Sequence, residues 1–285
     1  MPIPRAPLLI LGAVALAYCN ALFGPFQFDD YNVIAFNPAV TQWPPELAGL
    51  RPLLKLSYAL NWAIDPGPFG FHLFNVVLHA LNALLVFTLG SRLAAQYLEP
   101  PAARRAALAG ALLFALHPAH TEAVTYISGR SSALMSLFYL AGVLAFMRGR
   151  EQGDRLWLHG ISPLLFALAL LVKETAITLP FALLLWGLCR ERERPLWLAL
   201  LKSQWVHWVV LLATLVMIAL WPAYRDLIAL APTMDTLRTQ VHGVAYLLSR
   251  WFVLDGLNID PDLRVQNAWN AALLAQLAAL ALLFA

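Results

Sequence analysis

The sequence predicts an all-α polytopic membrane protein, and three observations carry this prediction. Of the 285 residues, 61% are apolar, whereas soluble domains have about 45–50%. Only 12% are charged, which is about half the usual share. The apolar residues also gather in runs that approach the roughly 20 residues needed to cross a hydrocarbon core of about 30 Å. This composition excludes a secreted or cytosolic domain, a coiled coil and a disordered chain.

Net charge and cysteine content exclude other classes. The formal charge of +3 is small and the basic residues form no nucleic-acid patch, so no nucleic-acid partner is expected. Cys19 and Cys189 give neither a disulfide framework nor the spacing of a paired metal ligand.

We expect eight spans in a single domain covering residues 1–285. The first follows Arg5 and resembles a signal peptide, but Tyr18-Cys19-Asn20 is a poor cleavage site, which favours an uncleaved span. Because the chain stops at the end of an apolar helix, we expect it to be an incomplete version of a longer protein. The spans lie at approximately 8–23, 71–90, 106–127, 131–147, 156–172, 175–189, 205–221 and 268–284. The third is the weakest, because Ala106–Leu116 is too short unless the helix continues past Pro118 or turns back.

The run Leu156–Cys189 predicts a helical hairpin. Its 34 residues would extend about 51 Å as one helix, which is too long for a single span. Arginines flank both ends, and basic residues mark the cytoplasmic side of a membrane. Both ends are therefore expected on that side, with Lys173-Glu174 at the far turn.

Charge distribution orients the remaining spans. The short segments assigned to the cytoplasm, together with the N-terminus, hold 11 of the 19 basic residues, and 11 of the 16 acidic residues fall outside. Large extracytoplasmic loops are predicted at Gly24–Gly70 and Pro222–Asn267, the first and fourth outer loops. Within the first, Leu50–Ile64 has apolar residues at helical spacing and is expected to form a short helix on the membrane surface.

Asp29-Asp30, just outside the first span, is the first candidate for chemistry. Two adjacent carboxylates among aromatic residues would be partly desolvated, which raises the pKa of at least one and suits a general base. The alternative is a solvated loop start.

The second span carries a polar arc. His72, Asn75, His79 and Asn82 follow at steps of three and four residues, which place them within about 80° on one helical face. Hydrogen bonding between helices is the favoured interpretation. His72 lies nearest the outer surface and is the member expected to touch a ligand.

His117, His120 and Glu122 form a third candidate, with Arg130 further along. Two histidines and a glutamate suggest a metal, but the spacing differs from the pattern that places both histidines on one helical face. Hydrogen bonding to a polar ligand, with Arg130 binding an anion, is the favoured interpretation.

Two further candidates come from the outer turns. Lys173-Glu174 has two interpretations. It is either an internal ion pair that neutralises a tight turn, or its lysine faces a phosphate.

The last outer loop carries Tyr246, Arg250 and Leu257–Asp262, and Val241–Leu254 is expected to be re-entrant or interfacial. Carboxylates, histidines and bases on one side of the membrane indicate a pocket for an amphiphile with an anionic head and a lipid tail.

A family resemblance rests on ordered motifs. Phe28-Asp29-Asp30, Arg51-Pro52-Leu53, the segment from Gly70 to Asn75 with His79, Leu113–Val124, Ser128-Gly129-Arg130 and Lys173-Glu174 follow one another. Together they resemble the transmembrane region of the transmembrane and tetratricopeptide-repeat O-mannosyltransferases and their bacterial relatives, within the GT-C glycosyltransferase superfamily. The resemblance covers residues 20 to 190 well. The further spans and repeat array usual in that family are missing here.

The resemblance implies a GT-C-like helical bundle and an inverting transferase that moves a hexose such as mannose. The donor would be a polyprenyl- or dolichyl-phosphate sugar, and the acceptor a hydroxyl of a protein or glycan. Asp29 would be the catalytic base, and Asp30 would position it or the acceptor. Donor phosphate contacts are assigned, in order of preference, to Arg130, Lys173 and Arg250, with Arg51 in addition. The sugar or acceptor pocket is assigned to His72, His117, His120, Glu122, Glu174 and Tyr246.

Membrane lipid is the remaining expected partner. The membrane would be an inner membrane or, in a eukaryote, that of the endoplasmic reticulum. The active face would be extracytoplasmic. No cofactor is expected, and a divalent metal is left open. Two alternatives belong to other classes: a transporter or flippase for an amphiphile, and an intramembrane metalloenzyme that uses His117, His120 and Glu122.

Overall fold

The computed structural model describes residues 5–190, 197–221, 233–254 and 262–283, and within these ranges the secondary structure is helical, without a strand. The predicted all-α class is confirmed. The chain divides into two compact units, Met1–Val216 and Met217–Ala285, which are described separately. The helices of the first unit are α1 (Arg5–Tyr18), α2 (Pro38–Thr41), α3 (Pro52–Ile64), α4 (Pro68–Ala94), α5 (Pro100–Leu116), α6 (Thr121–Thr125), α7 (Arg130–Gln152), α8 (Ser162–Val172), α9 (Leu179–Arg190), α10 (Trp197–Ser203) and α11 (Trp205–Leu220), whose last residues cross the unit boundary.

Three helical segments in the described ranges are long and apolar enough to cross a membrane: Arg5–Phe23, Pro68–Ala94 and Ile127–Gln152. They contain the predicted spans 8–23, 71–90 and 131–147. The predicted spans 156–172, 205–221 and 268–284 correspond to shorter apolar helices, Trp157–Val172, Trp205–Leu220 and Ala271–Leu283. That all of these cross the membrane stays a prediction, as does the span 175–189, which contains α9.

The predicted span 106–127 has the wrong boundaries. α5 begins at Pro100, six residues before the predicted start, and ends at Leu116. His117 is extended, with φ −68° and ψ 125°, as expected for a residue that precedes a proline. The chain then continues through a short 3₁₀ turn and α6 rather than as one helix.

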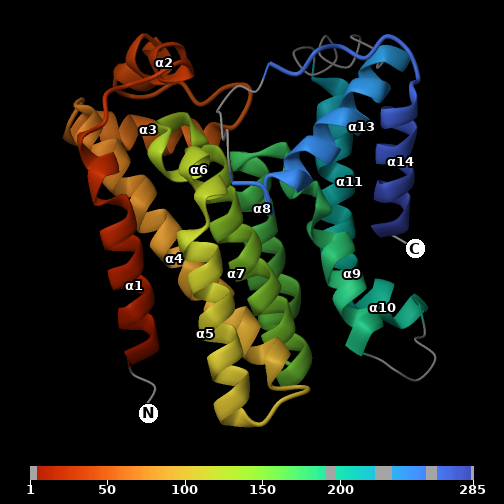
Figure 1. Cartoon of the computed structure of the whole chain (residues 1–285). Coiled ribbons are helices and arrows are strands. Elements are labelled where there is room, and N and C mark those ends of the chain that lie inside the picture. Colours follow the sequence, from red (N-terminus) through yellow and green to blue (C-terminus); the bar gives the residue numbers. More distant parts are fainter. Residues whose placement is uncertain (1–4, 191–196, 222–232, 255–261, 284–285) are drawn as a thin grey trace. The chain divides into compact units, whose positions relative to one another are not determined.

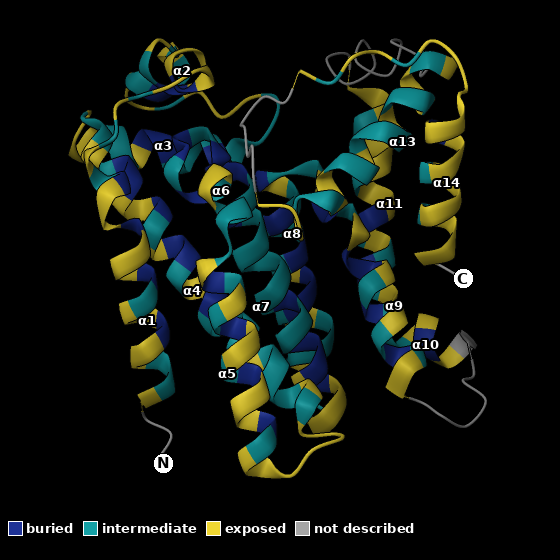
Figure 2. Cartoon of the chain, viewed as in Figure 1, coloured by how far each residue is buried: buried dark blue, intermediate teal, exposed yellow. Residues whose placement is uncertain are grey.

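Small residues set the packing of the long helices. α4 packs along α5 and α7, and α1 packs on α4 and α5. α5 buries Ala103, Ala107, Ala111 and Ala115, a four-residue spacing that keeps them on one face and lets helices approach closely. Large apolar residues such as Leu16 of α1 and Leu113 of α5 are exposed, and exposed residues are yellow in Figure 2.

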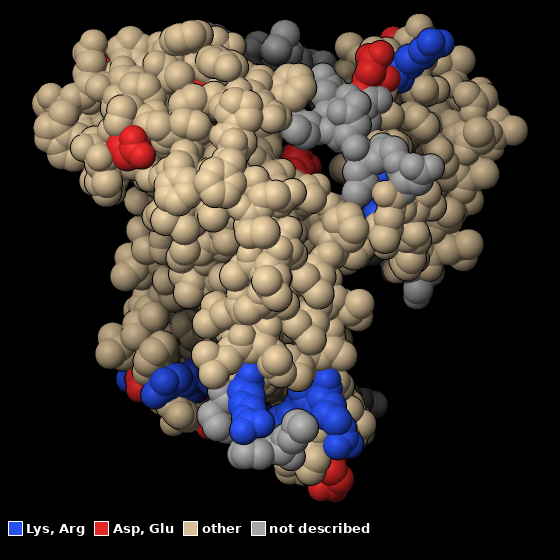
Figure 3. All heavy atoms as spheres, turned by 60° about the vertical axis from the view of Figure 1, so that its left-hand side comes forward, with Lys and Arg blue, Asp and Glu red and all other residues tan. Residues whose placement is uncertain are grey.

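The two ends of the long helices in the first unit differ in charge. Glu151 at the end of α7 pairs with Arg92 of α4 at 3.5 Å and with Arg190 of α9 at 3.3 Å. Lys and Arg gather at this end, the lower one in Figure 3. α8 stops at Val172 and α9 starts at Leu179. The pair between Arg190 and Glu151 brings the end of α9 back to the end of α7, so the run 156–189 folds back as the hairpin prediction requires.

The opposite end, which we call the polar end, carries the loops and short helices between residues 24 and 67 together with α6 (Figure 1). The predicted helix Leu50–Ile64 is present as α3 and begins with Pro52 in its first turn, a favoured position for proline. α3 packs on α4, α7 and α8 through the buried Leu54, Tyr58 and Ala59, while Leu60 and Ile64 stay exposed.

The polar arc of α4 bonds to backbone carbonyls of neighbouring segments. Asn82 Nδ2 donates to Ala133 O at 2.8 Å, and His79 Nε2 lies 3.0 Å from Ala115 O. Since a carbonyl only accepts, Nε2 carries the proton in His79. All four arc residues are buried, which agrees with hydrogen bonding between packed segments.

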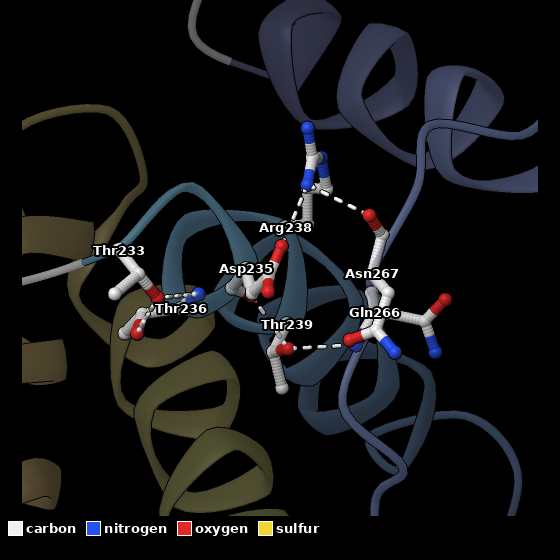
Figure 4. A network of polar contacts seen from close by, with 7 residues as sticks. All are labelled: Thr233, Asp235, Thr236, Arg238, Thr239, Gln266 and Asn267. Carbon is white, nitrogen blue, oxygen red and sulfur yellow. Dashed lines mark hydrogen bonds and ion pairs between the residues drawn. The ribbon is translucent and has the colours of Figure 1, made fainter.

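The second unit contains α13 (Met234–Ser249) and α14 (Ala271–Leu283). Arg238 of α13 pairs with Asp235 at 2.7 Å and donates to Asn267 O at 2.9 Å, and Thr239 Oγ1 accepts from Gln266 N at 2.9 Å (Figure 4). The predicted segment Val241–Leu254 continues α13 up to Ser249. Most of the predicted segment Leu257–Asp262 lies outside the described residues.

The contact between α7 and the turn before α8 requires a glycine. A Cβ on Gly149 would lie 2.7 Å from Leu158 N. Gly149→Ala should therefore lower the free energy of unfolding by about 1–3 kcal/mol through overpacking, measured by thermal unfolding in detergent. Gly110→Ala is the control, because nothing lies within 4 Å of a Cβ there. Equal stability of the two variants would contradict this packing.

Candidate functional site

Asp30 is buried at the polar end, with 1% of its surface exposed. Its Oδ1 accepts hydrogen bonds from Ser128 N at 2.8 Å and from Ser128 Oγ at 2.6 Å. Its Oδ2 accepts from Gln27 N at 3.0 Å. Three donors satisfy a carboxylate removed from water. Asp30 therefore attaches the loop that follows Phe23 to the segment that leads into α7.

Asp29 is exposed, in contrast to its neighbour. Its backbone N–H donates to Tyr126 Oη at 3.2 Å. The preceding residue, Phe28, has φ +44°, a left-handed conformation that costs an ordinary residue about 1–2 kcal/mol. The predicted desolvation of Asp29 is wrong for its side chain, because the turn presents that carboxylate to the surface.

Arg130 is fully buried, with 0% exposure. Its Nε donates to Asn75 Oδ1 at 2.9 Å, Nη1 to Ser57 O at 3.1 Å and Nη2 to Phe71 O at 3.2 Å. Its guanidinium carbon also lies 4.7 Å from the centre of the Tyr58 ring. Three of its five N–H donors are therefore used inside the bundle. That Arg130 contacts the donor phosphate stays a prediction, and this arrangement adds no support for it.

The segment 126–130, which we call the clamp segment, is held from several sides. Asn75 Nδ2 donates to Ile127 O at 3.2 Å, and Tyr58 Oη donates to Ser128 O at 3.4 Å. A Cβ on Gly129 would collide with the Glu122 carbonyl oxygen, so only glycine permits this close approach. The Ser-Gly-Arg motif thus has a structural explanation in each of its three residues.

His72 links two segments of the chain. Its side chain is buried and Nε2 bonds to Gly24 O at 3.1 Å. The bond joins α4 to the end of the first helical segment. The predicted place of His72 in a sugar or acceptor pocket stays a prediction.

Arg51 and Glu174 form a bidentate ion pair. Arg51 Nε lies 3.1 Å from Glu174 Oε1, and Nη2 lies 2.9 Å from Oε2. Burial alone would raise the pKa of Glu174, but the hydrogen bonds from Arg51 and the charges of Arg51 and Lys173 outweigh burial and lower it. Glu174 is therefore an ionised partner of Arg51, whereas the predicted ion pair joined it to Lys173. That Glu174 contacts sugar stays a prediction.

Lys173 is half-buried beside this pair. Its Nζ donates to Ser132 Oγ at 2.8 Å. Burial and the nearby Arg51 lower the pKa of Lys173, while the charges of Glu122 and Glu174 act in the opposite direction. An ammonium whose one described partner is a neutral hydroxyl is well suited to meet an anion.

His117, His120 and Glu122 lie at the polar end but not as one ligand set. The His120 ring centre is 4.3 Å from that of Phe114 and 6.2 Å from that of His117. Burial, and then His79 and His117, lower the pKa of His120 to about 4, so it is neutral near pH 7. In the part of the chain that the structure describes, no three His, Cys, Asp or Glu residues are grouped to hold a metal ion, which gives the zinc alternative no support.

Tyr246 and Arg250 belong to the second unit. The guanidinium carbon of Arg250 lies 4.8 Å from the centre of the Tyr246 ring. The structure describes this unit by itself, so their participation in a site with Asp29 stays a prediction.

Three residues of the polar end were missed as site residues: Tyr126, Ser128 and Ser132. Ser128 stands in the Ser-Gly-Arg motif, and that position was a usable signal. Tyr126 and Ser132 are ordinary in sequence, and only their contacts with Asp29 and Lys173 reveal them.

These features define an all-α membrane protein whose polar end brings an exposed carboxylate, a buried carboxylate and basic side chains onto neighbouring helix ends. A family model described as dolichyl-phosphate-mannose-protein mannosyltransferase matches residues 60–222, more than half of the chain. The chain belongs to this family, and the resemblance stated from its motifs is confirmed.

Named relatives agree with the family. The chain is 40% identical to the protein O-mannosyl-transferase Tmtc1 of Drosophila melanogaster, over 63% of this chain and 22% of that protein. It is 31% identical to the human protein O-mannosyl-transferase TMTC3, over 60% of this chain and 20% of that protein. The chain thus spans about a fifth of the length of the curated relatives it matches. No solved structure matches it significantly.

Arg130→Met tests the structural role of the buried arginine. The substitution leaves Asn75 Oδ1 and two carbonyls without their donor, so the free energy of unfolding should fall by about 2–4 kcal/mol. Arg148→Met is the matched control, because Arg148 is exposed and stacks on Trp157; its effect should stay under about 1 kcal/mol. If Arg130→Met unfolded at the normal temperature but bound the donor more weakly, Arg130 would be a phosphate ligand rather than a structural residue.

Proposed function

We propose that the chain carries the catalytic membrane region of an inverting mannosyltransferase. The reaction moves mannose from a polyprenyl-phosphate carrier, dolichyl phosphate in a eukaryote, to a hydroxyl group of a protein acceptor. Family membership supports mannosyl transfer to protein. The observation that carries the proposal is the exposed Asp29 on a turn whose next residue, Asp30, is locked into the bundle.

In this proposal Asp29 acts as the general base. It takes the proton of the acceptor hydroxyl while that oxygen attacks the anomeric carbon. The bond from this carbon to the phosphate oxygen breaks on the opposite face, and the leaving phosphate keeps the electron pair. One displacement inverts the anomeric configuration. The exposed carboxylate leaves room for a hydroxyl to approach, which the enclosed carboxylate of Asp30 does not.

Negative charge grows on the phosphate as the bond breaks, so cations nearby lower the barrier. Lys173 and Arg51 are the basic side chains that lie next to Glu174, and Lys55, the other base of residues 24–67, bonds to Ala48 O instead. Arg51 already pairs with Glu174, which leaves Lys173 as the first candidate. Arg250 of the second unit is proposed as an additional contact. In this proposal Lys173 takes precedence over Arg130 as the phosphate contact, because Arg130 is fully buried.

The polar end is proposed to face away from the cytoplasm. Lys and Arg gather at the opposite end of the first unit (Figure 3), and basic residues favour the cytoplasmic side. A lipid-linked donor would then place its phosphate at the polar end and its apolar tail along the exposed faces of the helices.

Asp29→Asn should abolish transfer without unfolding the protein. Loss of the base should lower kcat by about a hundredfold or more, measured as mannose transfer in membranes that contain the whole protein. Asp65→Asn is the control, because Asp65 is also an exposed carboxylate of the first outer loop and bonds only locally, to Gly67 N at 2.8 Å. Full turnover by Asp29→Asn would remove Asp29 from the mechanism.

Lys173→Met should weaken donor binding. Loss of a charged contact to phosphate should raise the donor KM or Kd about tenfold or more, while the acceptor KM changes little. Lys55→Met serves as the control; Lys55 Nζ donates to Ala48 O at 2.6 Å, elsewhere in the first outer loop. An unchanged donor affinity would show that the phosphate binds elsewhere.

A further inference from the structure

Tyr126 contacts the peptide of the proposed base. Its side chain is buried, with 9% exposure, and its hydroxyl oxygen accepts the Asp29 N–H at 3.2 Å. Its ring meets the ring of Phe28 edge-on, with centroids 6.4 Å apart. One side chain thus touches both the peptide of Asp29 and the residue before it.

The turn that carries Asp29 is fixed on both sides of this contact. Asp30 N donates to Gln27 O at 2.9 Å and closes the turn Gln27–Asp30. Asp30 Oδ1 bonds to Ser128, so the far end of the turn is anchored. Phe28, in between, holds its left-handed conformation, and such conformations persist where the surroundings determine them and often mark functional sites.

Tyr126 itself is rigidly placed. Asn75 Nδ2 donates to Tyr126 O at 3.4 Å, and Asn75 Oδ1 accepts from the buried Arg130. Burial raises the pKa of Tyr126; the hydrogen bonds with Asp29 and Ser128 oppose this, and the charges of Asp29 and Asp30 add to it. The phenol therefore stays neutral near pH 7 and keeps its acceptor oxygen fixed on the clamp segment.

We propose that Tyr126 is a positioning residue that sets the direction of the Asp29 carboxylate by holding the Asp29 peptide and packing on Phe28. The inference rests on the proposed function, since it requires Asp29 to be the base. Asp30 fixes where the turn sits, and Tyr126 fixes how the peptide of Asp29 is rotated within it. A rotation of that peptide would swing the carboxylate away from the acceptor hydroxyl, and small displacements of a reacting group are costly in rate.

Tyr126→Phe is the direct test in the whole protein. It keeps the ring against Phe28 and removes the acceptor oxygen. We expect kcat to fall about tenfold, with the donor KM within about twofold and the thermal unfolding temperature unchanged. Hydrogen exchange of the Asp29 amide should accelerate. Tyr139→Phe is the matched control, because Tyr139 Oη shares a hydrogen bond with Thr178 Oγ1 at 3.3 Å outside the clamp segment; its kcat should not change.

A double-mutant cycle separates positioning from a general loss of order. If Tyr126 acts through Asp29, Tyr126→Phe should change the residual turnover of Asp29→Asn by less than about twofold. Independent, multiplicative losses would overturn the inference. An inactive Asp29→Asn with a fully active Tyr126→Phe would overturn it as well and leave the proposed function standing. A fully active Asp29→Asn would overturn the proposed function itself, and the role of Tyr126 with it.

Discussion

A buried guanidinium is the constraint on which the polar end depends. Arg130 is enclosed by backbone carbonyls, an amide oxygen and aromatic faces, an environment in which its charge is stable only while each contact is kept. Its bond to Asn75 links α7 to α4, and Asn75 in turn bonds to the carbonyls of the clamp segment. The clamp segment then holds Asp30 and the peptide of Asp29.

Residues that are close together at the polar end differ in burial and in their number of internal hydrogen bonds. Asp30 and Arg130 are buried in the bundle, whereas Asp29 is exposed and Lys173 is half-buried, and the last two are the residues proposed to meet the substrate. The separation has a physical reason: a buried carboxylate or guanidinium with three hydrogen bonds inside the protein would have to leave its buried position, and lose those bonds, to meet a substrate in solvent. Groups with fewer hydrogen bonds inside the protein lose less free energy when they contact a substrate.

Much of the fold followed from the sequence, because hydropathy, helical spacing and flanking arginines are local signals. The hairpin around Lys173 and the interhelical bonds of Asn82 belong to this class. The arrangement of the candidate site could not be predicted in this way, because it depends on contacts between segments that are distant in the sequence. Asp29 and Asp30 are chemically alike and adjacent, yet Ser128, almost a hundred residues away, decides which is buried. The hydrogen-bond partners of Arg130 could not be predicted for the same reason, since its acceptors lie on α3 and α4.

The attachment of the first outer loop to the clamp segment can be measured by disulfide trapping. Cys19 and Cys189 are exposed and free and would first be replaced by alanine. Asp30→Cys with Ser128→Cys should then form a disulfide under mild oxidation in membranes, because the native side chains are 2.6 Å apart; fragments cut between them would stay joined. Asp65→Cys with Ser128→Cys should not link. Failure of the first pair, or equal linking of both, would contradict the account.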